Sequence, residues 1–336
     1  MTAQSSKNST YGLLKFVSRL PLPITRLMAS SLAGIVNLLK TSKTSETIRF
    51  NLKIALPELS EQQREEITRA SIRNELMSYF EFFSIWGSSN ERNLQRVHHV
   101  EGQHLLEEAL AANKGLVLIV PHFGTWEIMN AYLAQFTQMS IMYKPVKDPA
   151  VDDFVREARS REQATLLPTD ETGVRQIFKA LKQGGTTVIL PDHTPTAGGE
   201  YIPFFGVPLS SSNLSAKLIQ KTKAKCLFLF AMRNTEGGFD VFFEPLDEQI
   251  YSSTPNQGTE IIFKKMEELI HRYPEHYHWS YKRFKAHESL GGTIYRIPQD
   301  EALAKINDLR RAYQDEQAKL AAETLQTLNT NTAIES

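Results

Sequence analysis

Short runs of consecutive apolar residues alternate along this chain with longer segments in which apolar residues recur every third or fourth position. The runs Gly115–Val120 and Cys226–Met232 are short and almost wholly apolar, as expected of strands covered on both faces. The segments between such runs carry the spacing of amphipathic helices. Buried strands alternating with helices predict an α/β domain whose central sheet is covered by helices on both faces.

The pattern places the individual elements as follows. Strands are predicted at residues 115–120, 139–143, 186–190, 226–232 and 239–243. Helices are predicted within residues 43–90 and at 105–112, 126–136, 152–163, 173–183, 213–222 and 259–273. In a sheet of this kind, functional side chains gather in the loops that follow the strands.

The N-terminal end of the chain differs from the middle. Residues 1–10 are polar and expected to be disordered, whereas residues 11–39 are apolar and bracketed by basic residues. The uncharged run Leu27–Leu39 has 13 residues, fewer than the roughly 20 that cross a bilayer, and Pro23 and Arg26 are expected to interrupt any longer helix. The segment therefore suits an anchor lying at a membrane surface, with the first two helices of a soluble domain as the alternative.

These differences divide the chain into three parts. Residues 1–42 are expected to form a membrane-associating segment, and residues 43–297 are expected to form the main α/β domain. Residues 298–336 form a charged C-terminal helix and tail, in which Leu303, Ile306 and Leu309 share one apolar stripe.

Composition narrows the class of protein. Apolar residues make up 41% of the chain and charged residues 23%, which is ordinary for a globular protein with a sizeable core. The 38 basic and 38 acidic residues balance, so the charge does not favour a nucleic-acid partner. The single cysteine, Cys226, excludes an internal disulfide framework and fits a reducing compartment.

The clearest chemical motif follows the first apolar strand, in the segment Val120-Pro-His122-Phe-Gly-Thr-Trp-Glu127. His122 lies at the end of the strand, Thr125 is suited to cap the next helix, and Glu127 falls in the first turn of that helix. A carboxylate that holds one imidazole nitrogen leaves the other as a general base. The Gly-x-Ser-x-Gly nucleophile motif is absent, which favours direct attack by a substrate hydroxyl. A structural histidine beside an apolar strand is the alternative for this motif taken alone.

A second polar cluster follows the strand at 186–190. It contains Asp192 and His193, and a turn-rich segment with Phe204 and Phe205 comes after it. The two phenylalanines suit either a core or a substrate contact, and the Pro and Gly residues around them suit turns. Two loops at strand ends that carry Asp and His can share one cleft with His122 and Glu127.

These segments resemble, in the right order, the motifs of the bacterial lipid A biosynthesis acyltransferases, the late lauroyl- or myristoyl-type enzymes within the lysophospholipid acyltransferase superfamily. His122 to Glu127 is similar to the family's H-x4-E signature, Pro191-Asp-His193 to its P-D-Q element, and Pro203-Phe-Phe-Gly206 to its P-F-F-G element. Segments 51–60, 100–109 and 278–285 are also similar to family patterns, so the resemblance spans about residues 11–285. It implies a mixed central sheet of the glycerolipid acyltransferase type, with an N-terminal membrane-associating helix and a C-terminal helix.

The resemblance also implies roles for individual residues. His122 is expected to be the general base and Glu127 the carboxylate that orients it. Arg159 corresponds to an arginine expected to stabilise negative charge on the acyl oxygen or to bind a phosphate. Asp192, His193, Phe204 and Phe205 are expected to shape the substrate site; His193 departs from the glutamine usual at its position.

The implied reaction transfers a fatty acyl chain from acyl carrier protein to a hydroxyl of a lipid A precursor, without a cofactor or a metal ion. The implied location is the cytoplasmic face of the bacterial inner membrane. Lys282 and Arg283, interleaved with aromatic residues, are expected to form a basic rim that attracts the acidic carrier and the phosphates of the acceptor.

Three alternatives stay open at this stage. One is an acyltransferase that uses the same site on a different glycolipid or phospholipid acceptor. The second is a metal hydrolase built on His122, Glu127, Asp192 and His193, although no tight ligand spacing such as H-E-x-x-H supports it. The third is a lipid-binding protein without catalytic activity.

Overall fold

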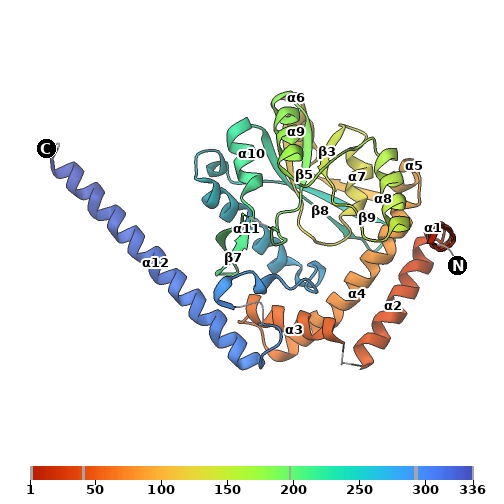
Figure 1. Ribbon diagram of the computed structural model, residues 1–336, viewed down its shortest axis with the longest axis horizontal. Coiled ribbons are helices and arrows are strands. Elements are labelled where there is room, and N and C mark those ends of the chain that lie inside the picture. Colours follow the sequence, from red (N-terminus) through yellow and green to blue (C-terminus); the bar gives the residue numbers. More distant parts are fainter. Residues whose placement is uncertain (1–2, 40–41, 197, 291–293, 335–336) are drawn as a thin grey trace.

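The computed structural model describes residues 3–39, 42–196, 198–290 and 294–334 (Figure 1). Its centre is a seven-stranded sheet in the order β1-β9-β8-β2-β5-β3-β4, in which all neighbours are parallel except the antiparallel pair β8–β9. The sheet is therefore mixed, as predicted. The strands are β1 (Val97–Glu101), β2 (Leu116–Ile119), β3 (Met139–Met142), β4 (Thr165–Leu167), β5 (Thr186–Ile189), β8 (Lys225–Arg233) and β9 (Phe239–Pro245).

All five strands predicted from the apolar runs are present, whereas β1 and β4 were not predicted. These two strands form the edges of the sheet, where burial is partial and polar residues such as His98 and His99 are tolerated. The central strand β2 is fully buried, which matches its unbroken apolar sequence.

Helices cover both faces of the sheet, because alternate strand residues enter two separate cores. Val117 and Ile119 join a core built with α9 (Glu171–Lys182), α10 (Leu214–Thr222) and α11 (Pro255–Arg272). Leu116 and Leu118 join a second core built with α6 (Gln103–Ala111) and α7 (Glu127–Leu133). The remaining helices of the domain are α3 (Lys43–Ala55), α4 (Glu61–Trp86), α5 (Asn90–Leu94) and α8 (Pro149–Arg161), with short 3-10 turns at Glu248–Tyr251, Pro274–His276, Arg283–Lys285 and Glu288–Leu290.

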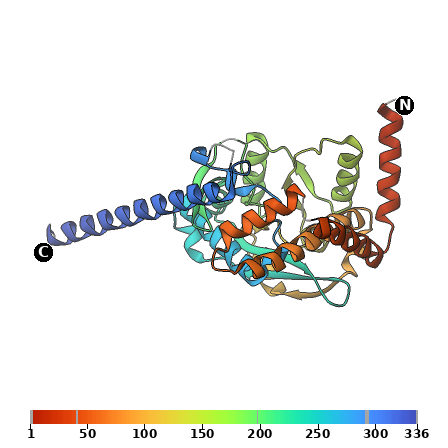
Figure 2. The same cartoon turned by 90° about the horizontal axis from the view of Figure 1, so that it is seen from below.

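Two helices, α1 (Ala3–Ser18) and α2 (Leu22–Leu39), form the N-terminal flank of the molecule (Figures 1 and 2). The expectation that residues 1–10 are disordered is wrong for residues 3–10, which belong to α1. Pro23 and Arg26 do not interrupt α2, since Pro23 occupies its first turn, where a missing N–H breaks no helical hydrogen bond. With 18 residues and a mean hydropathy of 1.4, α2 is long and apolar enough to cross a membrane, by length and composition alone.

One face of α2 is packed against the domain and the other is bare. Leu22, Thr25, Ala29 and Ala33 are buried, and the small side chains of Ala29 and Ala33 let α2 approach α4 closely. The opposite face exposes a row of large apolar side chains: Ile24, Leu27, Met28, Leu32, Ile35, Leu38 and Leu39. The helix therefore has the packed face of a domain helix and the apolar surface of an anchor.

A two-stranded hairpin, β6 (Glu200–Phe204) and β7 (Val207–Ser211), lies beside the main sheet. Phe205 and Gly206, both with positive φ, form its two-residue turn, which is the geometry of a tight hairpin. The C-terminal helix α12 (Gln299–Ile334) begins against this hairpin, where Arg310 donates to the carbonyl oxygen of Phe205. Its later part projects away from the body of the molecule, as Figures 1 and 2 show.

Candidate active site

His122 lies where the chain leaves β2, and Asp192 lies where it leaves the neighbouring strand β5. Nδ1 of His122 is 2.8 Å from Oδ1 of Asp192, and the backbone N–H of His122 donates to Oδ2 of the same carboxylate at 3.2 Å. Burial by itself would raise the pKa of Asp192, but the charge and hydrogen bonds of His122 outweigh it and lower that pKa below its usual range. Asp192 is therefore an ionised, buried partner that holds the imidazole by one nitrogen.

The carboxylate on His122 is thus not the one expected from the motif. Glu127 opens α7, and its oxygens bind Arg159 instead, at 2.7 and 2.9 Å from Nη2. The physical reason is the direction of each side chain: Asp192 comes from the strand paired with β2, whereas Glu127 points from the helix start toward α8. The expectation that Glu127 orients His122 is therefore corrected to Asp192.

Glu127 belongs to a buried network of its own. Besides Arg159, its carboxylate accepts hydrogen bonds from the indole nitrogens of Trp86 (2.7 Å) and Trp126 (3.1 Å). Arg159 also binds Glu162 at 2.9 Å. Burial disfavours a charged guanidinium, but the two carboxylates outweigh it and raise the pKa of Arg159. Trp126 also packs edge-on against the His122 ring at 5.0 Å, and so connects the two polar groups.

The other side of His122 is covered by a stack of rings. The His193 ring lies parallel to that of His122 at 3.7 Å, with an angle of 3° between the planes, and the Tyr281 ring continues the stack at 4.0 Å. Burial lowers the pKa of His193 to about 4, so this ring is neutral at neutral pH. Nε2 of His122 makes no hydrogen bond with any described residue, and the side chain is 18% exposed. That nitrogen is available to take a proton from a bound substrate.

Residues 276–281 complete the wall, and motif reasoning did not assign them roles. The hydroxyl group of Tyr277 donates to Oδ2 of Asp192 at 3.2 Å, and the backbone N–H of His278 donates to the carbonyl oxygen of His122 at 3.1 Å. The His278 ring packs against Trp126 at 4.7 Å. The aromatic and histidine residues around Trp279 were the available signal.

The loop that carries His122 rests on a buried ionic network. Glu81 of α4 is fully enclosed and accepts from the Thr125 hydroxyl (2.7 Å), from Nε of Arg233 (2.8 Å) and from Nε of Arg26 (2.6 Å). The expectation that Thr125 caps α7 is therefore wrong. The Thr125 side chain binds Glu81 instead. Because Arg26 belongs to α2, the N-terminal helix is linked to the motif loop through one carboxylate.

Three further residues that the sequence suggested for the substrate site are buried and have structural roles. Phe204 and Phe205 are buried in the core, Phe204 against Phe263 and Phe284, so the structure does not place them at a substrate surface. Arg283 is also buried and donates to the carbonyl oxygen of Ser210 at 2.9 Å and to the Ser211 hydroxyl. Arg283 is therefore not part of a basic rim, whereas its neighbour Lys282 is exposed.

An apolar pocket of about 150 Å³ opens beside Trp126. Its polar part is formed by the charged side chains of Glu127 and Arg159 and by the polar side chains of Asn130 and Tyr143. The rest is lined by apolar side chains from α7 and from strands β3, β5 and β8, or their ends: Met129, Leu133, Ile141, Met142, Val188, Leu190 and Leu229. The chemistry of these walls suits a hydrocarbon chain whose polar end stays near the ion pair.

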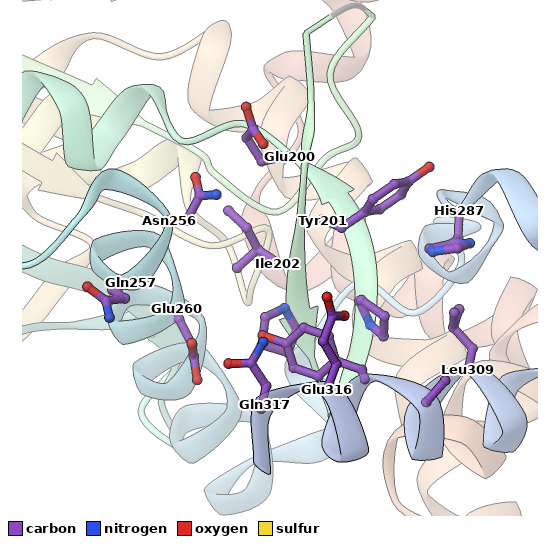
Figure 3. A pocket seen from close by; sticks show the side chains of 14 residues that line it. Glu200, Tyr201, Ile202, Asn256, Gln257, Glu260, His287, Leu309, Glu316 and Gln317 are labelled. Atoms are coloured by element: carbon purple, nitrogen blue, oxygen red, sulfur yellow. The ribbon is translucent and has the colours of Figure 1, made fainter. Parts of the chain in front are cut away.

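A larger pocket, of about 510 Å³, lies between the β6–β7 hairpin, the start of α11 and α12 (Figure 3). Figure 3 shows Glu200, Glu260 and Glu316 among its polar side chains. Its lining includes none of the residues around His122, so size alone does not identify the reactive site.

The geometry defines a class: an α/β protein with a histidine–aspartate pair at adjoining strand ends, an imidazole nitrogen that bonds to no described residue, and an apolar pocket nearby. Residues 9–286 match the model of the bacterial lipid A biosynthesis acyltransferase family, and the chain belongs to this family. It is accordingly an acyltransferase, and its family acts in lipid A biosynthesis.

Two relatives identified by sequence agree with this assignment. The chain is 24% identical over 277 residues to the lipid A biosynthesis lauroyltransferase of Escherichia coli K12, covering 82% of this chain and 89% of the relative. It is 27% identical over 278 residues to a lipid A biosynthesis acyltransferase of Haemophilus influenzae, covering 79% and 86%. Among solved structures, the 1-acyl-sn-glycerophosphate acyltransferase of Thermotoga maritima is similar with a TM-score of 0.33 and 17% identity, covering 71% of this chain and 98% of that one.

Proposed function

We propose that this protein transfers a fatty acyl chain from acyl carrier protein to a hydroxyl of a lipid A precursor, with His122 as the general base. The observation that carries the proposal is the imidazole held at Nδ1 by ionised Asp192, with Nε2 making no hydrogen bond to a described residue. This arrangement fixes the tautomer in which Nε2 accepts a proton, and it stabilises the imidazolium that results.

The reaction then needs no acyl-enzyme. Nε2 of His122 takes the proton of the acceptor hydroxyl as its oxygen attacks the thioester carbonyl carbon. The new oxygen–carbon bond forms, the carbon–sulfur bond breaks, and the proton passes from the imidazolium to the departing thiolate. These reaction steps use no serine or cysteine nucleophile. The single cysteine, Cys226, is buried in strand β8.

The pocket beside Trp126 supports an acyl donor. We assign it to the first part of the acyl chain, with the thioester near the polar part of the pocket. Arg159 borders the same space and carries positive charge where negative charge develops on the acyl oxygen. Glu127 holds Arg159 in that position, so we propose for Glu127 a role other than the one expected from the motif.

The bare face of α2 supports a membrane location. Its apolar side chains are exposed while its other face is fixed to α4, so it can lie in the surface layer of a bilayer and keep the active site beside the lipid acceptor. We place the protein at the cytoplasmic face of the inner membrane, where acyl carrier protein meets the growing lipid A precursor.

The test is transfer by purified protein from lauroyl-acyl carrier protein to a lipid A precursor, with the product mass measured. Wild type is expected to add one acyl mass, and His122→Ala to add none above background. An acceptor of another glycolipid class modified faster than the lipid A precursor would contradict the acceptor assignment. Activity abolished by a chelator and restored by a divalent ion would support the metal hydrolase alternative; no described group of three or more His, Cys, Asp or Glu residues is arranged to hold a metal.

A further inference from the structure

A third pocket, of about 410 Å³, lies between the start of α3 and the segment that leads into α12. Its charged side chains are Lys43, Lys282 and Arg296 against a single acid, Glu46. Among the described residues, Lys43, Lys282 and Arg296 form no salt bridge with a carboxylate, and the Lys282 ammonium lies over the Tyr295 ring. Three positive charges that face one hollow without a paired carboxylate among the described residues favour an anionic ligand.

The pocket has a rigid floor. The Tyr295 ring lies beneath the Lys282 ammonium at 5.4 Å and edge-on to Phe50 at 5.3 Å. The Tyr295 hydroxyl donates to Oδ1 of Asn51 at 2.5 Å and accepts from the backbone N–H of Phe284 at 3.2 Å. A floor fixed in this way keeps the overlying Lys282 ammonium near one position.

The same floor is connected to the catalytic wall. The Asn51 amide donates to the carbonyl oxygens of Trp279 at 2.7 Å and of Tyr281 at 2.9 Å. The Tyr281 ring is the outer member of the stack on His193 and His122. One asparagine therefore joins the basic pocket to the residues that cover the catalytic base.

The pocket also lies near the membrane-facing helix in the fold. Lys43 is the first residue of α3, and α2 ends shortly before it with the exposed side chains of Leu38 and Leu39. In Figure 1 the end of α2, α3 and the start of α12 lie along the same lower edge of the molecule. If α2 lies in the bilayer surface, the pocket is at the level of lipid headgroups.

We propose that Lys43, Lys282 and Arg296 bind a phosphate group of the acceptor lipid and so place its hydroxyl at His122. The proposal rests on the acyl transfer proposed above and adds the chemical feature that selects the acceptor. A guanidinium and two ammonium groups suit a phosphate ester, which offers several anionic oxygens. A hollow of this size at headgroup level favours a lipid phosphate over the acidic surface of the carrier protein.

The test compares wild type with Lys43→Gln/Lys282→Gln/Arg296→Gln on two acceptors, a phosphorylated lipid A precursor and the same lipid after phosphatase treatment. Each cation is expected to contribute about fivefold to kcat/KM for the phosphorylated acceptor, and the triple variant about a hundredfold. Wild type should use the dephosphorylated acceptor poorly, and the variant should use it equally poorly.

The matched control is Lys114→Gln/Lys179→Gln/Lys221→Gln. It removes three other exposed cations, near the edge where the parallel strands begin and away from His122, and is expected to leave both rates unchanged. Vesicle binding is measured with phosphatidylglycerol and with phosphatidylcholine, and KM is measured for the acyl carrier protein. The melting temperature of each variant confirms folding.

Several results would contradict the assignment of this pocket to the acceptor phosphate. The three cations would not select a phosphorylated acceptor if the triple variant lost kcat/KM equally on both acceptors. The same conclusion would follow if the wild-type enzyme used both acceptors equally well. A raised KM for acyl carrier protein would assign the cations to the donor. Loss of binding to phosphatidylglycerol vesicles with unchanged acceptor preference would assign them to bulk lipid. In each of these cases the wild-type enzyme still transfers acyl chains; a wild type that acylates neither acceptor would instead overturn the proposed function, and this site with it.

Discussion

Nδ1 of His122 lies 2.8 Å from Oδ1 of Asp192, a residue 70 positions later in the chain. Because this carboxylate is buried and ionised, it is the group that sets the tautomer of the imidazole. We expect Asp192→Asn to lower kcat by about two to four orders of magnitude, the scale of positioned general base catalysis, with little change in KM. Steady-state kinetics with acyl carrier protein thioester measures this.

The control is Tyr277→Phe, which removes a hydroxyl from the same carboxylate but leaves His122 and Asp192 in contact. Its loss of kcat should be much smaller. Wild-type turnover in Asp192→Asn would contradict the assigned pair, and the general base would then have to be oriented by another group.

The ion pair Glu127–Arg159 is expected to matter for both stability and rate. Removing the guanidinium leaves Glu127 and Glu162 as two buried carboxylates without their cation, which costs about 3–5 kcal/mol in the free energy of unfolding. Arg159→Lys keeps the charge but cannot bridge both partners, so it should fall between wild type and Arg159→Ala in stability and in kcat.

Arg161 offers a matched comparison on the same helix. It is partly exposed, and its side chain binds the backbone of Trp86 and the carboxylate of Glu157, which is also partly exposed. Arg161→Ala should therefore cost well under half of the loss seen in Arg159→Ala, measured by denaturant unfolding. A reversed order would show that the functional arginine of α8 has been misassigned.

The His122–Asp192 and Glu127–Arg159 pairs differ in how far they could be predicted from the sequence. His122 and Asp192 each follow an apolar run, and neighbouring parallel strands deliver their ends to one edge of a sheet, so their meeting in one cleft was predictable. The partner of each carboxylate was not predictable. Glu127 meets Arg159 because of where α8 packs, and that position depends on contacts made far along the chain.

Adjacent residues can also differ in ways that no local pattern reveals. Lys282 and Arg283 both looked like parts of a basic rim, yet one faces solvent and the other is enclosed by the β6–β7 hairpin. Similarly, Phe205 looked like a possible substrate contact, but its positive φ shows that it serves a hairpin turn. Side-chain direction in loops depends on tertiary packing, which a single sequence does not report.

His193 is expected to position the base and not to bind substrate. Replacing it with glutamine removes the ring stacked on His122, so kcat should fall about three- to tenfold, the range that corresponds to an aromatic pair, while KM stays constant. His193→Phe preserves a stacked ring and should retain more activity than His193→Gln. A raised KM with unchanged kcat would instead indicate a substrate contact.

Buried histidines are expected to make stability depend on pH. Burial lowers the pKa of His276 to about 4, whereas the ordinary value is 6.5. Between these values only the unfolded chain binds the proton, so the free energy of unfolding falls as the pH falls from 6.5 to 4, by about 1.4 kcal/mol per pH unit for each such group. His276→Gln should flatten the dependence by about that amount.

The ionisation of Glu75 changes the pH dependence of stability in the direction opposite to that of His276. Burial raises its pKa from 4.5 to about 7, so between these values the folded chain holds a proton that the unfolded chain releases. Its contribution to stability is present below pH 4.5 and is lost as the pH rises to 7. Glu75→Gln should therefore steepen the loss of stability on acidification, measured by urea unfolding from pH 4.5 to 7. A change of the same sign in both variants would contradict this account.

The last prediction separates the two faces of α2. Leu27→Glu/Ile35→Glu changes only the exposed face, so the melting temperature should stay near that of wild type. Each substitution removes a large apolar side chain from the bilayer contact and should weaken partitioning into vesicles by about tenfold or more. Transfer to acceptor in bilayers should fall accordingly, whereas transfer to detergent-dispersed acceptor should persist, because the active site is untouched.

Arg26→Met tests the packed face by contrast. It removes one of the two guanidinium groups on the enclosed Glu81, which also accepts from Thr125 in the motif loop. The variant should lose about 1–3 kcal/mol of stability and lose transfer in detergent as well as in bilayers. Flotation assays, unfolding curves and both transfer assays distinguish the two variants. If Leu27→Glu/Ile35→Glu unfolds, the apolar row is part of a core and not a membrane surface. If it stays bound to vesicles as firmly as wild type, attachment must come from another part of the molecule.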